Sequence, residues 1–230
     1  MKTILVTGAS RGIGRETAKW LLEAGHRVIA LARSEDKLQQ LKNQWPETAD
    51  ILAGDLCETQ TYEALSSMLE SADLSLDGII HNAGALLNKP FGETTDADWQ
   101  YLLDANLMSA VRLVQSCSGR LSPGSHVVFI GSMGGFQGSS KFPGLAAYSV
   151  SKGALSILTE CLAAELAAGK ICVNCLCLGA VQTEMLDAAF PGFKAPVEAH
   201  QMGAYIGHFA SEAHQFFNGR VLPVSLADPT

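Results

Sequence analysis

The stretch "TGASRGIG", residues 7–14, directly follows a short apolar run and carries glycines at positions 8, 12 and 14. Glycines at these positions let the backbone turn tightly and approach a diphosphate. The helix that begins here offers free N–H groups and a partial positive charge. The spacing is GxxxGxG, which differs from the more general GxGxxG. Because the stretch connects the first expected strand to the first expected helix, we interpret it as a nucleotide-binding turn.

Short apolar runs typical of buried strands recur along the chain, at residues 3–7, 27–32, 50–54, 77–82, 126–131 and 171–177. Helical patterns separate them, such as "GRETAKWLLEAG" at 14–25, which ends at a glycine. A final run at 219–225 is a candidate seventh strand. Strands that alternate with helices predict a parallel sheet covered on both faces. We therefore predict an α/β fold: a Rossmann-like, doubly wound parallel sheet of about seven strands, in a single domain over residues 1–230.

Charge and hydropathy limit the partners and the location that we expect. The chain has 16 Lys and Arg against 23 Asp and Glu, a net charge of −7, without a basic run. We therefore expect no nucleic-acid partner. The first apolar run is too short for a signal peptide, and none approaches the ~18 residues of a membrane span. These features indicate a cytoplasmic protein with no membrane association.

The cysteine pattern indicates buried thiols and no metal site. Cys172, Cys175 and Cys177 lie in the apolar run "KICVNCLCLGA". The spacing of the first two is found in metal sites, but no second CxxC or histidine pair completes a ligand set.

Two arginines indicate which nicotinamide cofactor the turn binds. The second strand is followed by "ALARSED" (30–36), so no carboxylate ends it to receive a ribose hydroxyl. Arg33 comes directly after this strand, and Arg11 lies inside the glycine turn. Two guanidinium groups here are suited to a 2′-phosphate, which favours NADP(H). The alternative for each arginine alone is a solvated surface charge.

The stretch "LAAYSVSKGAL" (145–155) places a tyrosine and a lysine four positions apart in a helical pattern. Tyr148 and Lys152 therefore project from one face of the predicted helix. Taken alone, the pair favours two amphipathic side chains, with apolar stems inside and polar tips at the surface.

Four motifs occur together and in a fixed order: "TGASRGIG", "HNAG" at 81–84, "IGS" at 130–132 and "YSVSK" at 148–152. An asparagine, Asn106, lies between them in "LDANL". With these motifs the chain resembles the short-chain dehydrogenase/reductase family over nearly its whole length. The resemblance implies an oxidoreductase that interconverts a ketone and a secondary alcohol, and a homodimer or homotetramer.

The resemblance also implies four catalytic roles. Tyr148 would exchange a proton with the substrate oxygen, and Ser132 would hold and polarise that oxygen. Lys152 would lower the pKa of the phenol, together with the positive charge of the oxidised cofactor, and would bind the nicotinamide ribose. Asn106 would support a water chain that returns protons through Lys152.

The cofactor-binding positions that the resemblance implies follow the ends of successive strands. They are Thr7, Gly8, Ser10, Arg11, Gly12, Ile13 and Gly14 in the turn, Arg33, Asp55, Leu56, Asn82, Ala83, Gly84, Val181 and Thr183, together with Tyr148 and Lys152. Two of them have structural alternatives: Asn82 can stabilise a turn, and Asp55 can act as a helix cap or loop carboxylate.

The chain departs from the family pattern at two places. The gap from Ser132 to Tyr148 is about three residues longer than expected, so Ser139 or Ser140 in the longer loop can take the polarising role. We prefer Ser132 because it follows a strand end, where a group is held rigidly. In "CLGAVQTEM", Leu178 stands where the family usually has proline.

Candidate pocket residues are mostly apolar, which suits many ketones: Leu86, Met133, Phe136, Phe142, Met185 and Leu186. The resemblance implies that the segment 183–196 forms a lid over the substrate, and we expect about two helical turns of it around 185–190. We predict an open pocket contacted by Met185, Leu186 and Phe190, unless the longer loop after Ser132 supplies the cover. The alternative function is a nucleotide sensor or scaffold without turnover, whose expected signature is loss of the tyrosine, lysine or serine.

Overall fold

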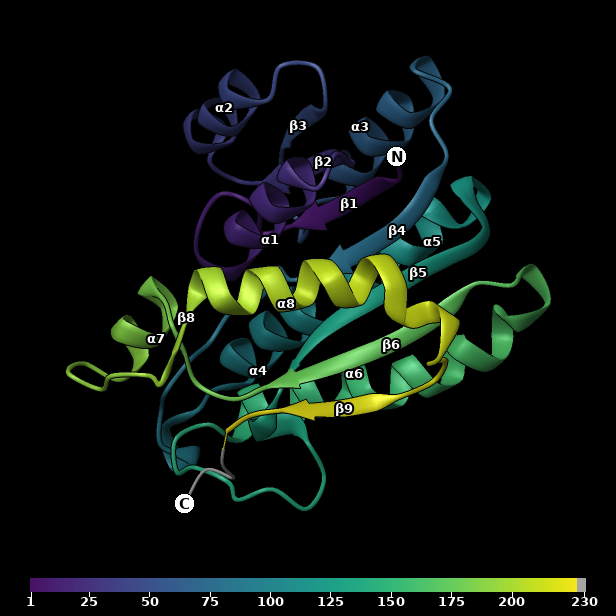
Figure 1. Cartoon of the computed structure of the whole chain (residues 1–230). Helices are drawn as coiled ribbons and strands as arrows, with labels where there is room; N and C mark the ends of the chain where they lie inside the picture. Colours follow the sequence, from purple (N-terminus) through teal and green to yellow (C-terminus); the bar gives the residue numbers. More distant parts are fainter. Residues whose placement is uncertain (227–230) are drawn as a thin grey trace.

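The fold is built on one sheet of seven parallel strands, seen in the computed structural model, which describes residues 1–226 (Figure 1). Across the sheet the order is β3-β2-β1-β4-β5-β6-β9. The strands are β1 (Thr3–Thr7), β2 (Arg27–Ala32), β3 (Ala49–Ala53), β4 (Leu76–His81), β5 (Leu121–Ser132), β6 (Cys172–Leu178) and β9 (Val221–Val224). The predicted fold class is therefore confirmed. All seven predicted strands are present, and β5 begins five residues earlier than its apolar run.

Helices cover both faces of the sheet. One face carries α1 (Gly12–Glu23), α2 (Glu35–Gln44) and α8 (Ala199–Glu212), and the other carries α3 (Thr59–Ser71), α5 (Ser109–Cys117) and α6 (Ala146–Glu165). Side chains of β1 alternate between the two cores: Ile4 and Val6 join one, and Leu5 joins the other. This alternation is the period of two that a pleated strand imposes.

Shorter elements surround the carboxyl ends of the strands. α4 (Asp96–Leu103) is joined to α5 by a π-helical turn, Asp104–Met108. Beyond β6, the two short strands β7 (Val181–Gln182) and β8 (Val197–Glu198) pair in parallel and enclose α7 (Glu184–Ala189). Single 3₁₀ turns occur at Phe91–Glu93, Ser118–Arg120, Met133–Gly135, Ala167–Gly169 and Ala213–Gln215.

The topology determines where a ligand can bind. After β1 the chain builds β2 and β3 on one side and then crosses to β4 on the other side of β1. Parallel sheets of this kind bind ligands at the carboxyl ends of the strands, beside this change of direction. In Figure 1 that edge lies on the left, where α7 and β8 extend from the sheet.

Two further observations concern the length of the helices and the state of the cysteines. None of the helices within residues 1–226 is long and apolar enough to cross a membrane. All six cysteines, each inside this range, carry free thiols; Cys175 and Cys177 are buried as expected, while Cys172 is half-buried.

Candidate active site

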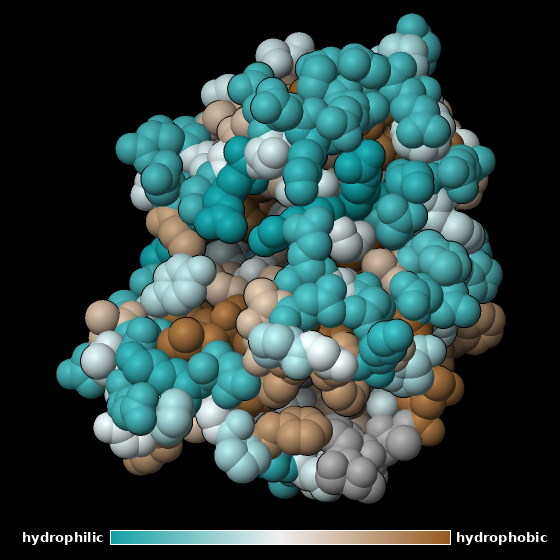
Figure 2. Space-filling view, turned by 90° about the vertical axis from the view of Figure 1, so that its left-hand side faces the viewer, coloured by the Kyte–Doolittle hydropathy of each residue, from teal (hydrophilic) through white to brown (hydrophobic). Residues whose placement is uncertain are grey.

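A large cavity of about 820 Å³ lies at the carboxyl ends of the strands. It extends along the edge of the sheet from Arg33, after β2, to Leu178, at the end of β6. Figure 2 looks onto this edge and shows apolar side chains around a hollow in the lower half, below a mostly hydrophilic upper part. The cavity is therefore long enough to pass from the glycine turn to the predicted catalytic residues.

The glycine turn is shaped by contacts between the ends of β1 and β4. Gly8 has φ of +68°, and a Cβ there would lie 2.8 Å from the Nδ2 of Asn82. The Thr7 hydroxyl oxygen accepts hydrogen bonds from the backbone N–H groups of Asn82 (3.1 Å) and Ala83 (3.0 Å). Asn82 in turn donates from Nδ2 to the Thr7 carbonyl oxygen at 3.2 Å. A glycine at position 8 is thus required by both the backbone conformation and the close approach of β4.

Most of the predicted cofactor-binding residues line the cavity. These are Gly8, Ser10, Arg11, Gly12, Ile13, Arg33, Asp55, Leu56, Asn82, Ala83, Gly84, Tyr148, Lys152, Val181 and Thr183. Thr7 and Gly14 lie outside it. Thr7 is fully buried and holds the β4 end, and a Cβ on Gly14 would lie 2.4 Å from the Gly8 carbonyl oxygen. The structure therefore places these two residues behind the turn, where they support it.

A group of cations lies at the glycine-turn end of the cavity. A smaller cavity of about 300 Å³ is lined there by Ser10, Arg11, Arg33, Ser34 and Lys37. Sequence reasoning found both arginines but missed Lys37, which comes four residues after Arg33 on the first turn of α2. Arg33 precedes α2, so helical spacing does not relate it to Lys37, and no sequence pattern marks this lysine as a neighbour of the two arginines.

Each of these cations has a carboxylate neighbour. Arg11 Nη1 lies 2.8 Å from Glu184 Oε2, and Lys37 Nζ lies 4.0 Å from Glu184 Oε1. Arg33 Nη1 lies 3.8 Å from Asp55 Oδ2. Glu184 was not expected here from the sequence, because it is 173 residues away from Arg11 along the chain. Its carboxylate reaches the turn from the start of α7.

Lys152 lies under the far end of the cavity and is only 4% exposed. Its Nζ donates a 2.8 Å hydrogen bond to the carbonyl oxygen of Ile130, on β5. Burial lowers the pKa of Lys152 to about 8, while the nearby thiols of Cys175 and Cys177 act in the opposite direction. The ammonium is therefore held in place by the strand that ends at Ser132.

Tyr148 is half-buried on the first turn of α6 and lines the cavity together with Ser132. Burial raises the pKa of Tyr148, and a hydrogen bond with the Ser132 side chain opposes this shift. The expected lowering of the phenol pKa by Lys152 is not among these causes. At neutral pH the phenol is thus protonated and lies beside a serine hydroxyl.

Of the candidate serines, only Ser132 lines the cavity. It ends β5, and its Oγ also accepts a 3.1 Å hydrogen bond from the Gly134 N–H. Ser139 instead donates its hydroxyl to the carbonyl oxygens of Met133 and Phe136, inside the loop. Ser140 does not line the cavity either. The geometry therefore brings Ser132, rather than the loop serines, to Tyr148.

Asn106 lies behind the cavity and is fully buried in the π-helical turn. Its Oδ1 accepts a 2.7 Å hydrogen bond from the Ala85 N–H, and its Nδ2 donates to the Ala85 carbonyl oxygen and to Ser151 Oγ, both at 2.9 Å. All its side-chain groups are thus used within the protein. Asn106 clamps the segment after β4 onto α6, one residue before Lys152.

His81, the first residue of "HNAG", supports the π-helical turn that carries Asn106. Ser109 donates its hydroxyl to the Ala105 carbonyl oxygen at 2.7 Å, and the same Oγ lies 2.9 Å from His81 Nε2. Because the serine proton is already engaged, Nε2 must carry the proton that the histidine donates. Burial lowers the pKa of His81 to about 3, with the charge of Lys152 as a second cause. His81 is therefore a neutral donor that holds the turn carrying Asn106.

Two segments contribute apolar side chains to the cavity. Leu86, Met133, Phe142, Met185, Leu186 and Phe190 line it, whereas Phe136 packs against the hydrophobic core instead. The loop after Ser132 therefore contributes cover through Phe142, in addition to α7. Both covers are attached to the segment after β4: Asn88 Nδ2 donates to the Ala189 carbonyl oxygen (3.0 Å), and Lys89 N–H donates to that of Gly144 (2.9 Å).

Leu178 takes the place of the expected proline without leaving the turn loose. It is buried at the end of β6, where it pairs with Ser132 of β5 and Val224 of β9. Strand pairing on both sides therefore fixes this position.

The chain matches one known protein family over most of its length. The sequence profile described as short chain dehydrogenase matches residues 2–192. The chain belongs to the short-chain dehydrogenase family. Among curated relatives of this family, carbonyl reductase (NADPH) 2 of Sus scrofa is 36% identical over 174 residues, 74% of this chain and 68% of that protein. The 3-oxoacyl-(acyl-carrier-protein) reductase FabG of Escherichia coli K12 is 28% identical, covering 97% of this chain and 96% of that protein.

Solved structures of short-chain dehydrogenases have the same fold. A dehydrogenase/reductase from Sinorhizobium meliloti 1021 superposes with a TM-score of 0.87 at 27% identity, covering 97% of this chain and 93% of the other. A short chain dehydrogenase from Burkholderia cenocepacia J2315, solved in complex with NADP, has a TM-score of 0.86 at 24% identity, covering 97% of this chain and 96% of the other. As a member of this family, the chain is an oxidoreductase.

Proposed function

We propose that this short-chain dehydrogenase interconverts a ketone and a secondary alcohol with NADP(H) as its cofactor. The observation that carries the proposal is the arrangement of one cavity: Ser132, Tyr148 and Lys152 meet at one end, and the cations of the glycine turn lie at the other. A serine, a tyrosine and a lysine gathered at the end of such a cavity are suited to proton transfer and to polarising a carbonyl oxygen.

The residues present fit a dinucleotide. The first turn of α1 leaves N–H groups without helical partners at the cavity wall, and the positive φ of Gly8 and Gly12 opens the backbone beside them. Asp55 and Leu56 would hold the adenine, and Asn82 to Gly84 would lie along the ribose. When bound, the nicotinamide supplies or accepts the hydride.

The protonated phenol of Tyr148 is the proton donor in the proposed reduction. Its Oη would give a proton to the carbonyl oxygen as a hydride reaches the carbonyl carbon, which balances the charge of the alcohol formed. Ser132 would orient that oxygen by a hydrogen bond from Oγ. The buried ammonium of Lys152 would stabilise the phenolate left behind, because opposite charges interact strongly where water is excluded. In the oxidation of an alcohol, the same phenolate would take the proton back.

The preference for NADP(H) rests on the cations at the glycine turn. Arg11, Arg33 and Lys37 line the smaller cavity with two serines, a set of donors suited to a phosphate dianion. The carbonyl reductase of Sus scrofa, 36% identical to this chain, has NADPH in its name. A charge-assisted contact to phosphate contributes roughly 1.5 to 3 kcal/mol, enough for at least tenfold discrimination against NAD(H).

The test is to titrate both reduced cofactors by fluorescence and then to follow the loss of NADPH absorbance with a panel of carbonyl compounds. We expect tighter binding of NADPH than of NADH, and turnover with ketones. Equal or tighter NADH binding would remove the cations from the proposed role. Cofactor binding without turnover on any carbonyl compound would instead favour a nucleotide sensor on the same fold.

A further inference from the structure

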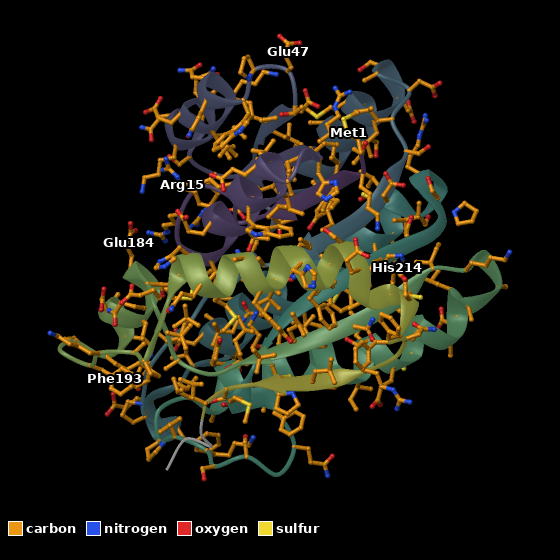
Figure 3. The ribbon with its side chains drawn as sticks, viewed as in Figure 1. Met1, Arg15, Glu47, Glu184, Phe193 and His214 are labelled. Carbon is orange, nitrogen blue, oxygen red and sulfur yellow. The ribbon has the colours of Figure 1, made fainter. Side chains whose placement is uncertain are left out.

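The carboxylate of Glu184 contacts cations that the proposed function assigns to the cofactor phosphate. Its carboxylate lies 2.8 Å from Arg11 and 4.0 Å from Lys37, two of the three cations around the smaller cavity. Figure 3 shows Glu184 projecting from α7 toward the part of the molecule that holds α1 and Arg15. A single carboxylate on the lid thus binds the same two cations that the proposed function assigns to the cofactor phosphate.

We infer that Glu184 is a specificity-determining residue, which competes with the 2′-phosphate of NADP(H) for Arg11 and Lys37 and so reduces the preference for the phosphorylated cofactor. The inference rests on the proposed function, because it presumes that the phosphate binds at these cations. A carboxylate and a phosphate accept hydrogen bonds from the same guanidinium donors. When both are near one cation, they also repel each other.

The carboxylate of Glu184 interacts with two cations, Arg11 in the glycine turn and Lys37 in α2. Its pKa is lowered, first by the hydrogen bond from Arg11 and next by the charge of Lys37. The Thr183 hydroxyl, rather than the glutamate, caps α7, since it accepts a hydrogen bond from the Leu186 N–H at 3.2 Å. The carboxylate can therefore be neutralised without removing the cap of α7.

The size of the effect follows from exposure. The side chains of Arg11 and Glu184 are 50% and 61% exposed, so water and salt screen their attraction. Exposed pairs of this kind contribute only weakly to an equilibrium constant, because solvent competes for both charges. We therefore expect Glu184→Gln to tighten NADPH binding by about two- to fivefold at low salt and by less at high salt.

Asp187→Asn provides a matched control. It removes one negative charge from the same helix, but its carboxylate accepts a hydrogen bond from Gln182 Nε2 at 2.5 Å, and the asparagine retains an acceptor there. A change in NADPH affinity that came only from the overall charge of α7 would occur in both variants. A change that comes from competition at the cations would occur in Glu184→Gln alone.

The experiment measures dissociation constants of NADPH, NADH and adenosine 2′,5′-bisphosphate by fluorescence and calorimetry for the wild type and both variants. Support would be tighter binding of NADPH and of the bisphosphate by Glu184→Gln, with NADH nearly unchanged. In an Arg11→Gln background, the effect of Glu184→Gln should shrink, because the shared cation is gone.

Two other results would have different meanings. If wild-type protein binds NADPH but Glu184→Gln binds it equally or more weakly, the inference is overturned while the proposed function stands; a weakening would show that the carboxylate orients Arg11 for the phosphate. If the wild type binds neither NADPH nor NADH, the proposed function fails, and the inference fails with it.

Discussion

The ammonium of Lys152 is bonded to the carbonyl oxygen of Ile130 at 2.8 Å, so the helix that carries Tyr148 is joined to the strand that ends at Ser132. This bond links two elements that are adjacent only in the fold. It fixes a cation, a phenol and a hydroxyl relative to one another before any substrate enters. A site with its charged groups already in place needs little rearrangement during the reaction.

Tyr148→Phe removes only the hydroxyl and should lower turnover by a factor on the order of 10² to 10⁴, the usual contribution of a positioned general acid. Cofactor affinity should stay nearly the same, since the ring remains. The measurement is kcat by NADPH absorbance together with the Kd by fluorescence. Tyr101→Phe is the matched control, because Tyr101 also lines the cavity but is half-exposed. Wild-type turnover in Tyr148→Phe would eliminate the assignment.

Ser132→Ala should reduce kcat strongly, by about 10²-fold, because it removes the hydroxyl next to the phenol. Ser139→Ala should change kcat little, since the Ser139 hydroxyl is bonded to the carbonyl oxygens of Met133 and Phe136 inside the loop. Steady-state kinetics of the two variants separates the cases. Should Ser139→Ala prove the more damaging change, the loop would have to supply the polarising group.

Much of this architecture was predictable from the sequence because it is encoded locally. Buried strands appear in the sequence as apolar runs, and the nucleotide-binding turn appears as a fixed spacing of glycines. These local patterns predicted the seven strands and the turn. The Tyr148 and Lys152 pair was equally visible, since one helical turn separates the two residues.

The unpredicted features depend on long-range contacts. The 173 residues between Arg11 and Glu184 leave no sequence pattern, and the same holds for the hydrogen bond from Lys152 to Ile130. Phe136 has the composition of a pocket residue, yet the loop turns it into the core. Composition alone does not distinguish an apolar side chain that lines a cavity from one that fills the interior.

The lowered pKa of Lys152 predicts that catalysis and cofactor binding weaken at alkaline pH. Its pKa, lowered by burial to about 8, means that the site holds the ammonium below this pH and the neutral amine above it. We expect kcat/KM for ketone reduction to fall as the pH rises through about 8. NADPH affinity measured on both sides of that pH should fall in the same direction. Lys152→Met should remove the pH dependence of this affinity; its persistence would assign the titration to another group.

The cavity predicts tolerance of bulky ketones. Its volume is about 820 Å³. Two of its lining side chains are partly open to solvent: Phe142 is 40% exposed and Met185 is 39% exposed. Side chains this exposed mark an entrance that bulky groups can share with solvent. We expect kcat/KM to vary by less than about tenfold as either side of the ketone is enlarged, because the added groups stay in contact with solvent, whereas in a closed hydrophobic pocket each methylene would contribute ~1 to 3 kcal/mol. A sharp cutoff at small ketones would show a closed pocket.

Buried histidines make the fold sensitive to acid. His126 is 1% exposed, with Nδ1 at 3.1 Å from the Ala210 carbonyl oxygen and Nε2 at 2.8 Å from Asn174 Nδ2. A carbonyl only accepts and an amide nitrogen only donates, so the ring must be neutral with its proton on Nδ1. Burial accordingly lowers the pKa of His126 to about 4.

The consequence for stability has a definite sign. Between about pH 6.5 and 4 the unfolded chain binds a proton at this histidine and the folded chain does not, so acidification favours unfolding. The loss at pH 5 is about 2 kcal/mol from His126, since each pKa unit is worth 1.36 kcal/mol. Denaturant unfolding at pH 7 and pH 5 measures this loss of stability, to which the fully buried His81 adds.

The His126→Gln variant should show a smaller loss of stability than wild type. The control His208→Gln, at an exposed position, should show the same loss as wild type. Equal losses in all three proteins would mean that His126 does not carry the acid sensitivity.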